Sequence, residues 1–356
     1  MHARLPLGIT LVSLLVGPLL TVTSAAAEPA PNPWLEHRVM NMAHSGGEDE
    51  APTNTMYAFK RAASIGSDML ELDVQSTADD ELVVIHDADV KRTTNGTGLV
   101  EDLTLEQVQG LDAAYWFVPG RNTVQGLPET TGARSSGVLA RPLAPSEGVT
   151  ARSADSAYPL RGARHGKKVP GYKNKDFRVP TLAEVFREFP DTPINIEIKG
   201  TADSDLASFK RTGRLLADFL NKSGRTDVIV ASFNDAALVD FHARAPQIGL
   251  APGMAGMMAY FLAGVKPIDG TVAFQVPVQF QGIPVATRAF VERAHADGYA
   301  VHVWFSGSAP DDAATYSRMI DACLDGLMPA KPSVLETVLD ERGIERPGRP
   351  GLDPCA

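Results

Sequence analysis

Short apolar runs alternate with longer amphipathic stretches along most of this chain of 356 residues. A short apolar run between turn residues predicts a buried strand, and an amphipathic stretch predicts a helix that packs against it. Strands that alternate with helices form parallel sheets. Counted generously, the pattern predicts eight strands, at residues 38–43, 68–75, 82–86, 194–199, 228–231, 247–250, 273–276 and 300–305. Eight such units close into an α/β TIM barrel, which is the fold class that we expect.

Helices are predicted between these strands wherever the apolar period lengthens. They fall at residues 55–65, 181–189, 205–221, 235–244, 287–297 and 311–323. Thr181 follows a proline and can cap its helix through its hydroxyl, and Asn54 or Thr53 can cap the first helix. We therefore expect one barrel domain over residues 38–340.

Two segments do not follow the pattern. Residues 119–176 are rich in Gly, Pro, Ser and basic side chains, and they predict a long insertion after the third strand. Because this insertion leaves the carboxyl end of a strand, a lid over a binding site and a surface excursion both remain open. The tail at residues 343–356 is rich in Pro and Gly, so we expect it to be irregular.

The first 27 residues have the features of a secretory signal peptide. Arg4 precedes an apolar run at residues 11–22, and small residues at 25–27 fit a cleavage site. The alternative is a single membrane anchor, although the run is short for a bilayer. We expect a mature protein that is secreted and not stably inserted in a membrane.

Export would place the two cysteines in an oxidising environment. Cys323 and Cys355 are the only possible pair, and a disulfide between them would tie the tail to the last predicted helix. Two free thiols are the alternative. Two cysteines in a chain of this length cannot form a disulfide framework.

The net charge of the chain limits the classes of partner that we expect it to bind. The chain has 33 Lys and Arg against 43 Asp and Glu, which gives a formal net charge of -10. Such a protein is a poor general binder of nucleic acid or anionic membranes, whereas a local cationic site for one phosphate remains possible.

Acidic side chains line one face of two predicted strands. Glu71 and Asp73 are two residues apart, so they share a face opposite Leu70, Leu72 and Val74. Glu197 likewise lies opposite the isoleucines of its strand. Bare carboxylates inside a barrel repel one another unless a cation neutralises them. Three oxygen donors without cysteine favour one hard divalent cation, Ca²⁺ or Mg²⁺.

Histidines and a lysine end neighbouring predicted strands. His44 and His86 follow the first and third strands and suit an acid/base pair, and Lys199 offers a positive charge to an anion. A cation and a lysine can offset the charge of phosphoryl oxygens while two histidines move protons, as cleavage of a phosphodiester requires. A strand E-x-D alone is more often a solvated face than a metal site, and a strand-end histidine alone is more often structural. The prediction therefore rests on finding several such features together at the carboxyl ends of separate strands. His302 shares a face with Trp304 and is predicted to be a barrel-interior residue.

Several motifs resemble those of the glycerophosphodiester phosphodiesterases. The segments are AHSGGEDEAPTNT, DMLELDVQST, VVIHD and RTTNGTG, followed by VPTLAEVF, INIEIK, VIVASF, GYAVHVWF and DGLMPAKP. They match the family pattern HRG…PENT…ElDV…HD…RTTnG and its downstream blocks. The likeness extends over about residues 39–339, and the insertion is its least matched part.

The resemblance implies a TIM barrel that hydrolyses small glycerophosphodiesters to sn-glycerol 3-phosphate and an alcohol. It implies His44 and His86 as the acid/base pair, and Lys199 near the phosphate. It also implies that Trp304 packs against the glycerol part, and that the metal ligands are Glu71, Asp73 and Glu197. Three positions depart from the pattern, because the family usually has Arg, Glu and Asn where this chain has Ser45, Thr53 and Ser306.

Two alternatives remain open from the sequence. One is a lipid phosphodiesterase similar to lysophospholipase D, which an apolar groove beside the site would favour. The other is a non-catalytic relative that binds phosphodiesters, which Ser45 would favour, since serine cannot grip a phosphate oxygen as arginine does.

Overall fold

A computed structural model describes residues 32–36, 39–120 and 158–355. The predicted signal peptide and most of the predicted insertion lie outside the described residues. Within the described part, no helix combines the length and apolar character needed to cross a membrane.

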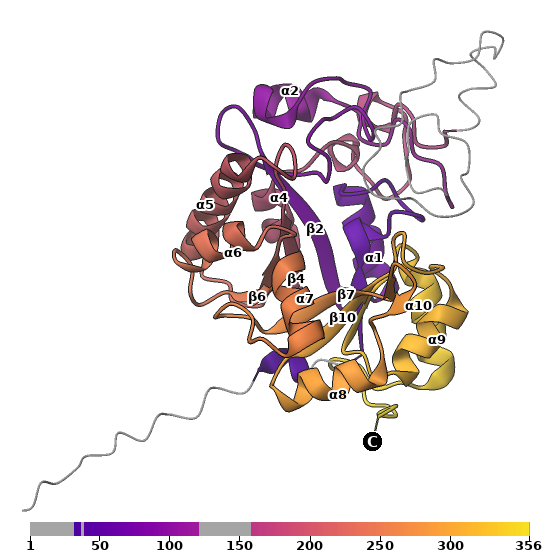
Figure 1. The fold of residues 1–356 in the computed structure, drawn as a ribbon. Coiled ribbons are helices and arrows are strands. Elements are labelled where there is room, and N and C mark those ends of the chain that lie inside the picture. The colour runs from indigo at the N-terminus through magenta and orange to yellow at the C-terminus, as the bar shows by residue number, and fades with distance from the viewer. Residues whose placement is uncertain (1–31, 37–38, 121–157, 356) are drawn as a thin grey trace, which may run out of the picture. The chain divides into compact units, whose positions relative to one another are not determined.

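Eight parallel strands form the predicted barrel (Figure 1). In sheet order they are β6 (Gly249–Ala251), β5 (Val228–Ala231), β4 (Ile194–Ile198), β2 (Met69–Ser76), β1 (Met40–Ala43), β11 (Gly326–Met328), β10 (Ala300–Trp304) and β7 (Ala273–Pro277). A parallel bridge between Leu250 and Thr271 brings the first and last of these strands together. The barrel is therefore nearly closed, and the expected fold class is confirmed.

Helices cover the outside of the barrel. They are α1 (Met56–Ile65), α4 (Leu182–Glu188), α5 (Leu206–Ser223), α6 (Asp235–His242), α7 (Met254–Ala263), α8 (Arg288–Ala296), α9 (Ala313–Asp321) and α10 (Pro332–Arg342). A further helix, α2 (Leu105–Gly110), belongs with Val83 and Ile85 to a separate apolar cluster. Thr181 caps α4 as predicted, but α1 is capped by Thr55 and not by Asn54 or Thr53. Asn54 instead adopts a positive φ of 55° and turns toward the barrel.

One predicted strand has a different place in the sheet. The segment 82–86 forms β3 (Leu82–Val84), which pairs antiparallel with β2 and lies off the barrel path. The eighth barrel strand is β11, which the pattern did not predict because Asp325 and Gly326 interrupt its apolar run. The long β2 extends beyond its neighbours, so β3 can return beside it, and Ile85 N–H donates to the carbonyl of Asp73 at 3.0 Å.

The two faces of the strands separate apolar from polar side chains, as the alternation predicts. The outer faces of β2 and β4 pack against α5 through buried aliphatic side chains, among them Leu72, Ile196 and Leu216. The inner faces carry small and medium residues together with the acidic ones. Trp34, in the short helix η1 (Pro33–Leu35), belongs to the apolar cluster of the barrel interior.

The tail forms no helix or strand among the described residues after α10, as predicted, but its contacts hold it against the barrel. Cys355 forms a disulfide with Cys323 just after α9, which confirms the predicted pairing. Arg346 is 3% exposed and donates to Asp68 at 2.8 Å and to both oxygens of Glu336. The tail is thus held by one covalent bond and one buried ion pair network.

We expect Arg346→Ala to lower the free energy of unfolding by about 3 kcal/mol, because it removes the buried guanidinium that Asp68 and Glu336 share. Urea denaturation measures this change. The matched control is Arg342→Ala, which breaks a pair with the exposed Asp321 and should cost at most about 1 kcal/mol. Equal losses in the two variants would contradict this account of the tail.

Candidate active site

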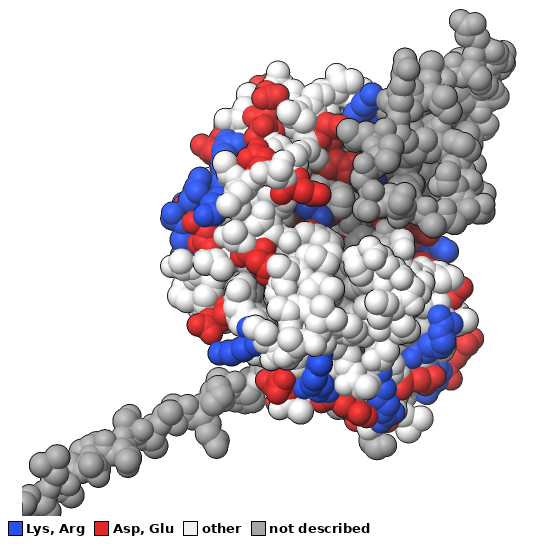
Figure 2. Space-filling view, in the orientation of Figure 1, with Lys and Arg blue, Asp and Glu red and all other residues white. Residues whose placement is uncertain are grey.

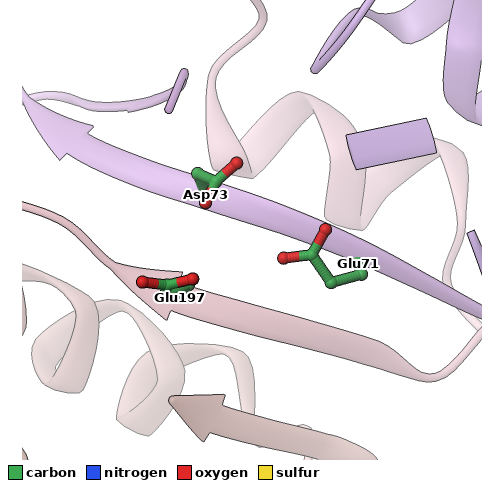
Figure 3. A group of neighbouring side chains, drawn as sticks. All are labelled: Glu71, Asp73 and Glu197. Atoms are coloured by element: carbon green, nitrogen blue, oxygen red, sulfur yellow. The ribbon is translucent and has the colours of Figure 1, made fainter. Parts of the chain in front are cut away.

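Three carboxylates converge between β2 and β4. Asp73 lies directly opposite Glu197 in the parallel register, and Glu71 precedes Asp73 by two residues on the same face. Figure 3 shows the three side chains pointing into a common space between the two strands. One oxygen from each residue lies within 4.8 Å of the others. This donor set fits a hard divalent cation, since it consists of oxygen ligands alone.

Lys199 partly balances these charges. Its Nζ lies 2.7 Å from Glu197 Oε1 and 3.2 Å from Asp73 Oδ1. Burial would lower the pKa of Lys199, but the two carboxylates outweigh burial and raise it, so the lysine stays charged. One ammonium beside three carboxylates leaves the group with a negative charge that a bound cation can neutralise.

The environment shifts the pKa values of Glu71 and Asp73 in opposite directions. Burial, together with the charges of Asp73 and Glu197, raises the pKa of Glu71 to about 8. Burial would also raise the pKa of Asp73, but Lys199 outweighs it and holds that pKa below its ordinary value. Glu71 therefore carries the cost of gathering three acids in one place, as expected for a site that holds a cation.

His44 stands beside Glu71 at the carboxyl end of β1. Its Nε2 lies 3.9 Å from Glu71 Oε2, and its Nδ1 lies 3.1 Å from Glu48 Oε1. Burial alone would lower the pKa of His44, but Glu71 and Glu48 raise it to about 10. A cation held by Glu71 would oppose that increase, because its charge repels the imidazolium.

Ser45 has a structural role where the family motif has arginine. Its backbone N–H donates to Glu71 Oε2 at 2.6 Å, and its hydroxyl donates to Asp73 Oδ2 at 3.2 Å. Asn54 donates to the same oxygen of Asp73 at 2.8 Å. Both polar residues therefore orient carboxylates of the cluster.

Gly46, the next residue, has a φ of 83°, and a Cβ added at this position would lie 2.6 Å from the Cβ of Ala58.

His86 reaches the site by a different route from the predicted one. The sequence suggested that it ends a barrel strand, but it follows the antiparallel β3, which runs back along β2 toward Asp73. Its Nδ1 lies 2.8 Å from Asp87 Oδ1, and the Arg92 guanidinium contacts both oxygens of Asp87. The imidazole is thus supported on one side and half-exposed on the other.

One pocket of about 230 Å³ brings most of the predicted residues together. Its lining includes His44, His86, Glu71, Glu197, Lys199 and Trp304. Asp73 lies just beneath it, in contact with Lys199. Trp304 and Phe233 face each other edge to face, with ring centroids 6.4 Å apart. His302 is fully buried in the barrel, where burial lowers its pKa to about 3, so it is an interior residue as predicted.

Several residues of this site had no role in the sequence analysis, and three of them lie beside predicted residues. Glu48, Asp87 and Phe233 each contact or neighbour a predicted residue. Asp87 could have been found from its position next to His86. Glu48 gives only a weak signal, because it is one of three consecutive acids, and Phe233 becomes visible only when β5 is placed beside β4.

The fold and these side chains define a TIM-barrel hydrolase of phosphoric diesters, and comparison with known proteins gives the family. Residues 44–332 match the model of the glycerophosphoryl diester phosphodiesterase family. This match spans most of the chain, so the protein belongs to that family.

Individual relatives agree with this assignment. A glycerophosphodiester phosphodiesterase of Caldanaerobacter subterraneus subsp. tengcongensis is 29% identical over 86% of this chain and 100% of its own length. A mouse lysophospholipase D is 33% identical over 45% of this chain and 36% of its own. A phosphodiesterase of Oleispira antarctica, solved with the product sn-glycerol-3-phosphate, has a TM-score of 0.56 at 19% identity, with 84% of this chain and 96% of that chain covered.

We expect a divalent cation to bind at the three carboxylates. Glu197→Gln removes one anionic ligand, so it should weaken the affinity by at least about tenfold. Isothermal titration with Ca²⁺ and with Mg²⁺ measures this change. The matched control, Glu188→Gln, alters an exposed glutamate on α4 that pairs with Lys60. Equal affinities in Glu197→Gln and the wild type would contradict the assignment.

Proposed function

We propose that the protein is an exported, divalent-metal-dependent glycerophosphodiester phosphodiesterase that uses His44 and His86 for proton transfer. The observation that carries this proposal is the pocket in which both histidines lie beside the acidic cluster and Lys199. A phosphodiester in this pocket would meet positive charge on its phosphoryl oxygens and would lie near both imidazoles.

Each residue of the pocket has its own role in the proposed hydrolysis. One histidine takes the proton of the attacking hydroxyl, which belongs to water or to the neighbouring glycerol, as the new P–O bond forms. The other histidine gives a proton to the leaving alcohol as the old P–O bond breaks. Lys199 attracts the phosphate, and Trp304 packs against the glycerol part. A bound cation would supply further positive charge for the phosphoryl oxygens.

Export rests on separate support. The signal-like segment at residues 1–27 suggests it, and the disulfide between Cys323 and Cys355 suits an oxidising compartment. A mature protein that begins near Glu28 in the medium of expressing cells is the expected finding.

We expect His86→Ala to lower kcat on glycerophosphocholine by about 10²- to 10⁴-fold, because one proton transfer loses its catalyst. A chelator should abolish turnover, and the cation should restore it. Release of sn-glycerol 3-phosphate is the measurement, and His165→Ala, which alters an exposed histidine, is the control. Undiminished turnover in chelator or in His86→Ala would overturn the mechanism, and binding without product would favour the non-catalytic alternative.

One feature favours a second substrate class, the lysophospholipids. Part of the pocket lining is apolar and includes Phe233, Pro252, Met254, Met257, Pro277 and Met328. No charged residue occurs at residues 252–265, which include α7. Figure 2 shows an uncharged area over α7 in the middle of the face in view. Such a wall can accommodate an acyl chain next to the phosphate.

If the apolar wall binds an acyl chain, Met254→Ser should lower kcat/KM on lysophosphatidylcholine by about three- to tenfold. Its effect on glycerophosphocholine should be less than about twofold, so the two substrates serve as each other's control. Equal effects on both substrates would show that the wall does not discriminate between them.

A further inference from the structure

We propose that Glu48 is a positioning residue that holds the imidazole of His44 by its Nδ1. The structure places Glu48 Oε1 3.1 Å from that nitrogen, and Glu48 is only 6% exposed. The two ring nitrogens of a histidine point in different directions, so a partner on one fixes where the other points. With Nδ1 bound to Glu48, Nε2 is the nitrogen that faces Glu71 and the pocket.

The turn between β1 and α1 is built to aim this one carboxylate. Gly47 has a φ of 91°, and its N–H donates to the His44 carbonyl at 2.7 Å. Ala51 N–H donates to the carbonyl of Gly47 at 2.9 Å, which closes the turn around Glu48. The geometry that brings position 48 back to position 44 is therefore fixed by the backbone.

The two acids that follow Glu48 have other partners. Asp49 lies 3.6 Å from Lys331, and Glu50 pairs with Arg61 and accepts from Ser333. Of these three consecutive acids, Glu48 is the one that contacts His44. A general attraction between acidic residues and an imidazole would not favour Glu48 over its two neighbours. Asp49, the next residue in the chain, therefore serves as a matched control.

The imidazole of His86 also has a carboxylate on its Nδ1, and this parallel supports a positioning role for Glu48. Asp87 contacts Nδ1 of His86, and Arg92 contacts both oxygens of Asp87. The charge of Arg92 also helps to lower the pKa of both Asp87 and Glu48. The two histidines are therefore oriented by two carboxylates that share the field of one guanidinium. A carboxylate on the far nitrogen is a recurring way of fixing a catalytic imidazole.

The sequence resemblance assigns no role to Glu48. It falls between His44 and Thr53, in the stretch that the family pattern leaves unspecified, and Thr53 itself stands where that pattern has Glu. Thr53 is buried, and its hydroxyl has no hydrogen-bond partner among the described residues. The carboxylate that supports His44 therefore comes from outside the family motif.

A first test is independent of activity. In protein labelled with ¹⁵N-histidine, we expect a downfield, exchange-protected proton resonance from Nδ1–H of His44, identified by its loss in His44→Ala. Glu48→Ala should abolish it, and Asp49→Ala should keep it. A resonance that persists unchanged in Glu48→Ala would overturn the proposal.

A second test uses turnover, and this part rests on the proposed function. Glu48→Ala should lower kcat by about ten- to hundredfold and change KM by less than about twofold, while Asp49→Ala changes neither. In a His44→Ala background, Glu48→Ala should add less than about twofold, because it acts through that histidine. The same loss in both backgrounds would overturn the proposal.

Two variants and two readouts keep the outcomes separate. If Glu48→Ala does not fold, Glu48→Gln preserves the shape and an acceptor oxygen but removes the charge, so it should shift the resonance upfield and lower kcat less than tenfold. An unshifted resonance with unchanged kcat in Glu48→Gln would then count against the proposal. A wild type that cleaves no glycerophosphodiester would refute the proposed function, while the resonance would still decide the role of Glu48.

Discussion

The charge balance at the mouth of the barrel constrains the rest of the site. Glu71, Asp73 and Glu197 are brought within a few ångströms of one another, and the ammonium of Lys199 contacts two of them. Gathering buried acids in this way is costly unless positive charge is added. The raised pKa of Glu71 reflects that cost, because burial and the neighbouring carboxylates disfavour its charged form. The same negative charge attracts the imidazole of His44 and makes the pocket suitable for a cation and then for a phosphate.

The barrel provides this arrangement through register. Because β2 and β4 are adjacent and parallel, Asp73 and Glu197 share one level of the barrel. The aliphatic residues between them point outward to the helices, so the acids can be buried without weakening the core. The backbone of Ser45 and the side chain of Asn54 then fix individual oxygens. Of these two residues, Ser45 departs from the family motif and Asn54 keeps it.

Sequence patterns predicted the barrel and the convergence of Glu71, Asp73 and Glu197. These acids lie on strands in which apolar and polar residues clearly alternate. The pattern failed where an element is short or departs from the simple βα repeat. The apolar run of β11 is interrupted by Asp325 and Gly326, and β3 has the composition of a barrel strand although it pairs antiparallel. Glu48 could not be predicted, since its contact depends on the left-handed turn at Gly47 and not on any period.

Adding Mn²⁺ to the protein gives the most direct test of whether the three carboxylates, a cation and a phosphate meet at one site. Its unpaired electrons enhance the relaxation of nearby nuclei, so ³¹P spectra of sn-glycerol 3-phosphate report whether phosphate and cation share the pocket. We predict strong enhancement in the wild type and its loss in Glu197→Gln. No enhancement in the wild type, or undiminished enhancement in the variant, would contradict the account.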